Sequence, residues 1–450
     1  MRARAASTTT SQAAKDKSQP VLSCEHVSRG RSILQYLLIY LMLLVPGSSL
    51  MFVYGGTALY GIMLGCFIFC VLLSCRYRDS YGICLIVLLL INTFVTRSLV
   101  GGVGIEAFLG FAACVVCTQM AICCDYKNFL HRWINAVVVL ASISVVMWAL
   151  LLAFPSFRDL LIPVFPTDYE GTPPWGVQHY GHGMLLYSWF DLHAMRNTGI
   201  FTEPGKYQVV LNSALFLLLF WNDRIQWKSK RGWKLSIVII LLALVTCQST
   251  TGYMGMLLVV LFYLLRRANG ARMSAKGLLG IAIVVIAMVL MIDWSLNGAE
   301  SVFYTQIVQK ISGGGQGIDL SKGTGAPRMI MIQASLESIV EHPFGVGSDA
   351  LRSLAESMGG RPVAASFFQY GATYGVIGWA LVLLMVFYPV LSSAPLLSAT
   401  LFMLLFLNTT ASQTHLLYPS LLMIPMYIAI GRGWPLARER SRSSKRGAGR

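Results

Sequence analysis

The residues best suited to chemistry are gathered in the segment 196–208, which reads RNTGIFTEPGKYQ and leads into a long apolar run. Arg196 and Lys206 bring two cations, and Glu203 stands directly before Pro204. Proline is favoured at the first position of a helix, and a helix start presents free N–H groups and the positive end of its dipole. Two cations beside such a start are suited to bind an anion such as phosphate. The alternative is that Glu203 only caps the helix while the two cations reach lipid headgroups.

A further cation, Arg328, stands at the beginning of a second candidate segment. Behind it, apolar residues recur every three or four positions over 328–341, at Met329, Ile332, Leu336 and Ile339. This spacing predicts an amphipathic helix that lies on the membrane surface or on a helix bundle. Arg328 would then be held near the membrane surface, where it binds an anion, contacts a headgroup or forms an ion pair.

Two other residues join Lys206 as candidates for substrate binding. Arg97 follows the third predicted membrane span, where it is either an anchor for that span or a third cation for a diphosphate. His342 lies in the sequence EHPFGVG at 341–347, which can also be interpreted simply as a helix end followed by flexible glycines.

No metal site or nucleotide-binding loop is predicted. His179 and His182 are spaced for metal binding, but no carboxylate or cysteine completes a site. Cys114 and Cys117 lack a second pair, so we interpret them as small buried hydrophobic residues. The glycine-rich stretch 312–317 lacks the Gly-Lys-Ser/Thr of a phosphate-binding loop. We therefore expect chemistry without a metal or cofactor, on a substrate that carries its own leaving group.

The elements that position these residues are predicted to be membrane helices. The chain has 450 residues, of which 56% are hydrophobic and 12% charged, whereas a soluble domain carries roughly 25% charged residues. Long uncharged apolar runs indicate helices that cross the bilayer. We predict an all-α integral membrane protein with about twelve spans at 33–50, 54–74, 81–96, 103–123, 129–153, 204–221, 235–248, 253–265, 277–292, 367–388, 396–408 and 416–430.

The distribution of Lys and Arg predicts how these spans are oriented. If both termini lie in the cytoplasm, 26 of the 35 Lys and Arg residues fall in cytoplasmic segments, as the positive-inside rule requires. The net charge of +16 is therefore a topology signal, and nucleic acid is not expected as a partner. The predicted organisation is a basic tail 1–32, spans in 33–153, a first large outer loop 154–203, spans in 204–293, a second outer loop 294–366, spans in 367–430 and a basic tail 431–450.

Four short motifs, in order along 196–378, resemble those of the O-antigen polymerase and ligase superfamily. They are Arg196-x-x-Gly-x-Phe-x-Glu-Pro-Gly at 196–205, STTGY at 249–253, Pro327-Arg328 followed by HPFGVG at 342–347, and YGVIG at 374–378. The resemblance implies a fold related to the GT-C glycosyltransferases and a metal-independent transfer of glycan from polyprenyl diphosphate. It also implies that Arg196 and Arg328 contact the diphosphate and the acceptor. Ligases of this family often carry a His-Asn pair where this chain reads AASFF at 364–368, which favours a polymerase.

The predicted function is the joining of polyprenyl-diphosphate-linked oligosaccharides on the outer face of a bacterial inner membrane, with the active site facing the periplasm. Arg196, Glu203 and Arg328 are the predicted catalytic residues, and Glu203 is either the base for the acceptor hydroxyl or the group that orients Arg196. Expected partners are lipid-linked oligosaccharides, membrane lipid and a chain-length regulator protein. The alternatives are a ligase that moves glycan to another acceptor lipid and a transporter of lipid-linked glycans, which would carry more charges within its spans.

Overall fold

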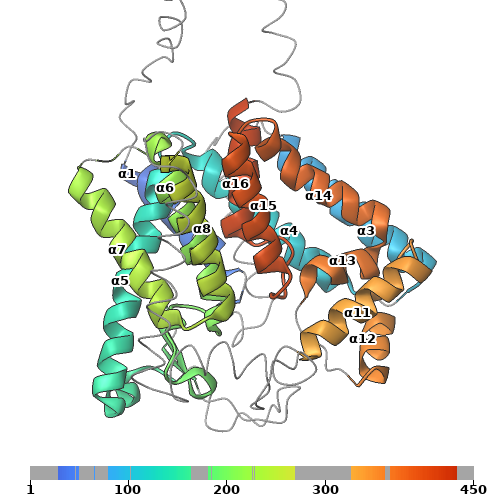
Figure 1. Cartoon of the computed structure of the whole chain (residues 1–450), viewed down its shortest axis with the longest axis horizontal. Coiled ribbons are helices and arrows are strands. Elements are labelled where there is room, and N and C mark those ends of the chain that lie inside the picture. Colours follow the sequence, from blue (N-terminus) through green and yellow to red (C-terminus); the bar gives the residue numbers. More distant parts are fainter. Residues whose placement is uncertain are drawn as a thin grey trace, which may run out of the picture.

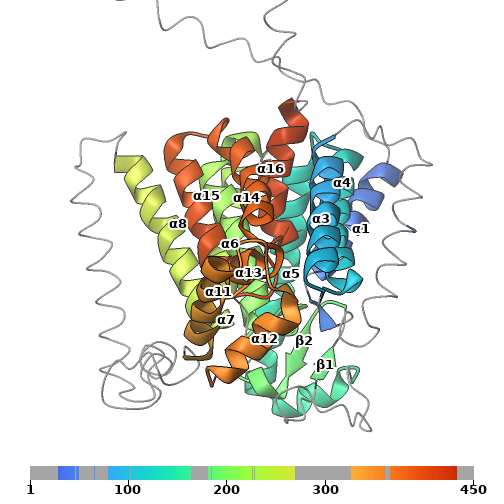
Figure 2. The same ribbon diagram turned by 90° about the vertical axis from the view of Figure 1, so that its right-hand side faces the viewer.

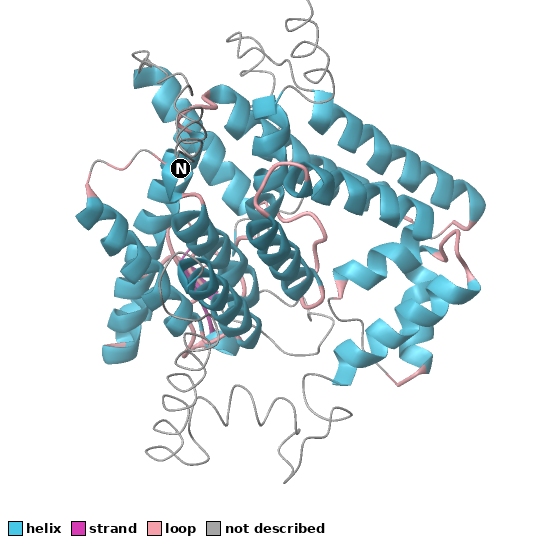
Figure 3. Cartoon of the chain, turned by 45° about the horizontal axis from the view of Figure 1, so that its top comes forward, coloured by secondary structure: helices cyan, strands magenta, loops and turns pink. Residues whose placement is uncertain are grey.

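The computed structural model describes residues 29–45, 47–49, 65, 80–101, 103–163, 181–183, 185–225, 227, 229–268, 326–359 and 365–432. Within these ranges the chain folds into packed helices and one small antiparallel hairpin (Figure 1; Figure 3). The predicted span 277–292 lies outside the described residues, and so does 54–74 apart from Gly65. The glycine-rich stretch 312–317 and His179 also lie outside them.

The helices follow the predicted apolar runs closely at most ends. They are α1 (Arg29–Leu44), α3 (Ser80–Leu99), α4 (Ile105–Cys124), α5 (Phe129–Ala153), α6 (Pro204–Phe220), α7 (Lys230–Cys247), α8 (Thr250–Ala268), α11 (Ala326–Glu341), α12 (Gly347–Ser357), α13 (Ser366–Tyr374), α14 (Val376–Leu391), α15 (Leu396–Thr410) and α16 (Pro419–Arg432). Short 3-10 turns are η1 (Pro155–Leu160), η2 (Asp191–His193) and η3 (Asn222–Arg224). Strands β1 (Gly181–Gly183) and β2 (Ser188–Phe190) pair with His182 opposite Trp189.

Three helices in the described ranges are long and apolar enough to cross a membrane. They cover Ser80–Leu99, Ala107–Cys124 and Tyr126–Ala153, and Val376–Leu391 and Leu396–Thr410 are shorter apolar helices. The architecture is therefore that of a helical membrane protein, and the total of twelve spans stays a prediction. In Figure 2 the hairpin and α12 lie at one end of the bundle, and the C-terminal end of α16 lies at the other.

Helix α6 is the most deeply buried element among the described helices. From Tyr207 to Phe220 every one of its residues is buried, and α7, α8 and α16 pack around it. Because apolar residues surround the whole helix rather than one stripe, it belongs in the interior of a bundle. Two glycines of α8 permit the close contact with α6, since a Cβ on Gly252 would lie 2.9 Å from the Cβ of Gln208 and one on Gly255 would lie 2.6 Å from the Asn212 amide nitrogen.

The predicted span 367–388 is wrong as a single helix, because the chain breaks at Gly375 into α13 and α14. Gly375 has φ +84°, and a Cβ there would lie 2.7 Å from the carbonyl carbon of Phe344. The Val376 N–H donates to the Pro343 carbonyl at 2.9 Å, and the Val346 N–H donates to Ala372 at 2.9 Å. The HPFGVG and YGVIG motifs therefore contact each other through their main chains. This contact fixes the end of α11 against the start of α14.

Helix α11 begins near the predicted position, and α12 follows where only flexible glycines were expected. The two helices and α13 share a small hydrophobic core that is separate from the main one, made of Met331, Ala334, Leu351, Ala355, Ala365 and Ala372. Gly347, Leu351 and Ala355 of α12 are buried and stand four positions apart, so the helix has an amphipathic sequence signal that the prediction missed.

A group of polar side chains joins α1, α4 and α5, and we call it the Asp125 clamp (Gln35, Asp125, Asn128 and Arg132). Arg132 pairs with Asp125 at 2.8 Å, and both side chains are at most 10% exposed. The same Arg132 nitrogen donates to the Gln35 amide oxygen, and Gln35 donates to the Ala121 and Asp125 carbonyls at 2.7 and 2.9 Å. Arg132 is therefore a buried residue near the start of α5, inside the predicted span 129–153.

Candidate functional site

The site is built around Glu203, which is the N-cap residue of α6. Its backbone is extended (φ −149°, ψ 149°), and Pro204 occupies the first turn as predicted. The side chain makes no capping hydrogen bond. Instead its carboxylate lies 3.8 Å from the Lys206 ammonium, which also donates to the Thr202 hydroxyl at 3.1 Å. Glu203 thus stands at the predicted cap position, but its charge is directed at Lys206 rather than at the helix backbone.

The segment before Glu203 is held rigidly by its own small polar residues. The Asn197 amide donates to Ser144 and Thr246 hydroxyls at 3.1 and 3.0 Å, and its oxygen accepts from the Gly199 N–H at 3.0 Å. Gly199 has φ +58°, and a Cβ there would lie 2.9 Å from the ring of Tyr207. Asn197 and Gly199 therefore serve to position the chain, and the cations beside them carry the chemistry.

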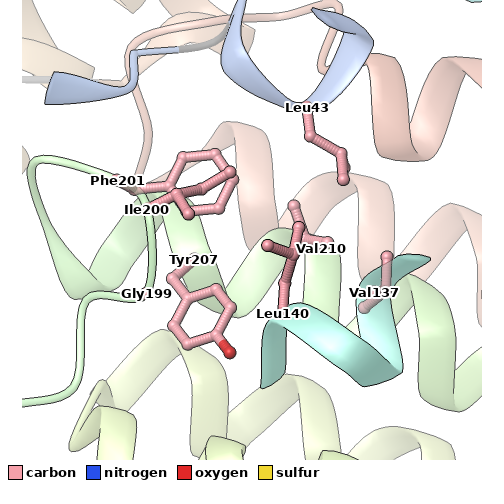
Figure 4. A pocket seen from close by; sticks show the side chains of 8 residues that line it. All are labelled: Leu43, Val137, Leu140, Gly199, Ile200, Phe201, Tyr207 and Val210. Carbon is pink, nitrogen blue, oxygen red and sulfur yellow. The ribbon is translucent and has the colours of Figure 1, made fainter. Parts of the chain in front are cut away.

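Apolar side chains anchor the same segment from behind. Ile200 and Phe201 lie with Tyr207 around a small apolar pocket that α1, α5 and α6 complete (Figure 4). The hydroxyl of Tyr207 is hydrogen-bonded to that of Ser144 at 2.8 Å. This packing fixes the position of Arg196 and Glu203 on either side of it.

Arg196 is largely buried and incompletely bonded. One terminal nitrogen donates to the Gln248 carbonyl at 2.6 Å, while its Nε is buried with no hydrogen-bond partner in the described part of the chain. Burial lowers the pKa of the guanidinium, while Cys247, Tyr253 and, more weakly, Glu203 act in the opposite direction. Gln248 has φ +47°, an uncommon backbone conformation outside glycine. The turn between α7 and α8 therefore presents its carbonyl to Arg196 at some conformational cost.

Arg328 approaches the same carboxylate from α11. Burial lowers the pKa of its guanidinium as well, and Glu203 again opposes that effect. Arg328 donates no hydrogen bond to the residues that the structure describes. The charge of Glu203 thus acts on two arginines from distant parts of the sequence, although only Lys206 forms an ion pair with it in the described ranges. We call Arg196, Glu203, Lys206 and Arg328 the Glu203 cluster.

The connection between α15 and α16 forms another wall of the site, which the sequence did not reveal. The side-chain amide of Gln413 packs against Gly205. A Cβ on Gly205 would lie 2.5 Å from the amide nitrogen of Gln413. The Gln413 carbonyl accepts from the Ser366 N–H at 3.1 Å, at the start of α13. Tyr418, which is buried, ends the same connection directly before α16. The only sequence signal was the polar stretch SQTH at 412–415 between two apolar runs.

The other two predicted binding residues are not drawn into the cluster. Arg97 is exposed in the last turn of α3, and His342 is exposed directly after α11. The structure records no interaction of either side chain with Glu203 within the described ranges. Their substrate-binding role stays a prediction.

The Glu203 cluster has the charge balance of an anion site. Three cations and one carboxylate act on one another electrostatically, and the buried Nε of Arg196 has no hydrogen-bond partner in the described part of the chain. Arginine offers paired donors that match phosphate oxygens. Such a cluster at a helix start is suited to a ligand with more than one negative charge, and diphosphate fits that description.

The fold and site together define a helical membrane protein with a partly buried cluster of three cations and one carboxylate. Residues 235–383 match a family model described as O-antigen ligase, which confirms the resemblance to the O-antigen polymerase and ligase superfamily and supports a membrane enzyme that processes glycans. Comparison of the chain with curated proteins finds no match. The matched segment contains Arg328 and the contact between Pro343 and Val376, while Arg196 and Glu203 lie before it.

Proposed function

We propose that the protein joins polyprenyl-diphosphate-linked oligosaccharides into a longer glycan on the outer face of a bacterial inner membrane. The observation that carries this proposal is that two largely buried arginines from distant parts of the sequence, Arg196 and Arg328, both lie within electrostatic range of Glu203. A sugar on a lipid diphosphate brings its own leaving group, so the enzyme needs only to hold that group and to position an acceptor hydroxyl.

In this reaction the acceptor hydroxyl oxygen attacks the anomeric carbon of the donor glycan. A new bond forms between that oxygen and the anomeric carbon, and the bond from the anomeric carbon to the diphosphate breaks with its electron pair on the diphosphate. The hydroxyl proton passes to Glu203. Arg196 and Arg328 neutralise the charge that develops on the departing diphosphate, and fixed cations at such a position stabilise a transition state by several kcal/mol.

A ligase is the second candidate, because the matching family model carries that description. It would use the same diphosphate site and differ in its acceptor, a separate lipid rather than a second lipid-linked unit. Where related ligases often carry a His-Asn pair, the described residues here are Ala365 and Ser366, and the Ser366 hydroxyl donates to the Thr410 carbonyl at 3.0 Å. That substitution favours the polymerase.

The test uses the purified full-length protein and a lipid-linked repeat unit. The wild type should give a ladder of longer glycans, while single addition to a different lipid would identify a ligase. Arg196→Ala and Arg328→Ala should abolish product formation. Arg352→Ala is the matched control, since Arg352 lies on α12, is 59% exposed and pairs only with Glu356 in the described part of the chain. Full ladders from both arginine variants would reject the proposal.

A further inference from the structure

The end of α15 and the connection that follows it touch the starts of three other helices. Asn408, in the last turn of α15, donates to the Thr251 carbonyl at the start of α8 at 3.0 Å. The Gln413 carbonyl accepts from the Ser366 N–H at the start of α13 at 3.1 Å. The side chain of Gln413 lies on Gly205 at the start of α6. Because Gly205 and Thr251 belong to two of the four family motifs, the connection joins motifs that it does not itself carry.

The side chain of Gln413 fills the space directly beside Gly205. A Cβ on Gly205 would lie 2.5 Å from the amide nitrogen of Gln413, and 3.1 Å from both the carbon and the oxygen of that amide. Gly205 belongs to the regular helix α6, so the reason for a glycine there is this contact rather than the backbone conformation. Gln413 is 4% exposed, so its amide is a packed group and is not open to a ligand.

The backbone of Gln413 is attached to the unit that carries Arg328. Ser366 begins α13, and α13 shares the small separate core with α11 and α12. These three helices lie together at one side of the bundle (Figure 1). The hydrogen bond of Val376 attaches this unit to α14, whereas Gln413 attaches it to the first turn of α6. One residue therefore contacts both of the parts that meet at the Glu203 cluster.

The relative position of these two parts matters for the proposed reaction. Glu203 stands at the start of α6, and Arg328 stands in the first turn of α11. Close-packed contacts transmit displacements, so a shift at Gln413 would change the position of Arg328 relative to Glu203. A misplacement of about 1 Å in a catalytic arrangement can lower the rate by about 10²-fold.

We infer that Gln413 is a positioning residue, which holds the unit that carries Arg328 in register with the start of α6 by packing on Gly205 and bonding Ser366. The inference rests on the proposed function, since it assigns how the two halves of that site are held together. The buried side chain of Gln413 does not reach a substrate. Its loss should therefore lower kcat and leave the KM for the donor unchanged.

The experiment measures kcat and KM per folded molecule of the purified full-length protein with a lipid-linked repeat unit. Gly205→Ala forces a methyl group into the Gln413 amide, and it should lower kcat by about 10²-fold with KM unchanged. Gly205→Ala combined with Gln413→Asn restores the space, because asparagine is one methylene shorter than glutamine. This double variant should be about tenfold more active than Gly205→Ala alone, since the two residues are in direct contact.

Gly255→Ala is the matched control for a crowded glycine. Its Cβ would lie 2.6 Å from the amide nitrogen of Asn212, which is a contact of the same kind deeper along α6. The variant should lower the unfolding temperature and keep the wild-type kcat per folded molecule, because that contact does not involve the unit that carries Arg328.

Two results would overturn the inference. One is a double variant that is no more active than Gly205→Ala, and the other is a loss of kcat in Gly255→Ala as large as that in Gly205→Ala. Gln413→Ala adds no atom, so it tests the same contact if Gly205→Ala does not fold. It should lower kcat by about tenfold or more with KM unchanged, and a wild-type kcat would contradict the inference. The wild-type ladder tests the proposed function separately, because the ratios between variants can be measured on whichever glycan product the protein forms.

Discussion

The Asp125 clamp and the Glu203 cluster both place arginines in largely buried positions, but they bond them very differently. In the clamp, one nitrogen of Arg132 serves both Asp125 and Gln35, and the surrounding amides are also bonded. In the cluster, Arg196 makes one bond to a carbonyl and keeps a buried Nε without a partner in the described residues.

The difference in hydrogen bonding separates an arginine that stabilises the fold from one that is available to a ligand. Burying a charge is costly unless it is paired and hydrogen-bonded. The clamp meets that requirement from within the protein, so its arginine has little capacity left for a ligand. The cluster leaves its guanidinium donors underused, and a bound anion is the partner that would complete them. Substitutions at the two places should therefore have opposite consequences.

The largest effect on stability is expected for Arg132→Ala. It removes one partner from a buried pair and leaves Asp125 uncompensated, which should lower the free energy of unfolding by about 3–5 kcal/mol. Thermal unfolding in detergent measures this change, with the exposed Arg267→Ala as control. Product formed per folded molecule should stay at the wild-type level. A wild-type unfolding temperature would show that the clamp is not structural.

The next effect is on catalysis and leaves the fold intact. Arg328→Ala should lower kcat/KM by about 10²–10³-fold, because one fixed cation is lost from the leaving-group site. Its unfolding temperature should not fall, since Arg328 has no hydrogen bond to the described residues that could be lost. Initial rates with a lipid-linked donor and a thermal scan of the same preparation give both quantities. If Arg328→Ala lost stability together with activity, Arg328 would have a structural role like that of Arg132, and the two arginines would not differ as argued.

A smaller effect is expected at the contact that connects α11 to the bundle. Gly375→Ala forces a Cβ against the backbone of Phe344 and requires φ +84°, and strained backbone of this kind costs of order 1–3 kcal/mol. Gly101→Ala separates the two causes, because Gly101 has φ +77° with nothing within 4 Å of its Cβ. Unfolding free energies of the two variants should differ, with Gly375→Ala the less stable. Equal losses would mean that the close approach at Gly375 contributes nothing.

The smallest effect is expected at Lys206. Its ammonium is 3.8 Å from Glu203, a carboxylate that is 39% exposed, and ion pairs at partly exposed positions contribute at most about 1 kcal/mol. Lys206→Gln should therefore reduce kcat/KM by no more than about tenfold. Lys230→Gln, on the exposed start of α7, is the control for a lost charge. A loss as large as that of Arg328→Ala would place Lys206 among the essential cations.

The parts of the site that could be predicted are those set by neighbours in sequence. Pro204, the apolar run behind it and the nearby cations predict the start of α6 with Glu203 at its cap, and the spacing of Met329, Ile332 and Leu336 predicts α11. The meeting of Arg196 and Arg328 depends on how α11 docks, which no local pattern specifies.

Other features could not be predicted because their causes lie in distant contacts. A continuous apolar run concealed the break at Gly375, since only the approach of Phe344 reveals why the chain must turn there. The span 129–153 predicted the helix that carries Arg132, but the burial of its charge depends on Gln35 from α1 and Asp125 at the end of α4. Gln413 and Tyr418 carry no motif, and only their packing beside the start of α6 shows that they border the site.

The small core shared by α11, α12 and α13 has a consequence for how this protein can change. Because its buried residues form a cluster apart from the main core, substitutions there are absorbed locally, and the bundle does not have to repack. It is attached to α14 by main-chain hydrogen bonds and by the ring of Phe367, whose centroid lies 4.9 Å from that of Trp379. A substitution inside the small core can therefore change how Arg328 is presented while the main core stays as it is.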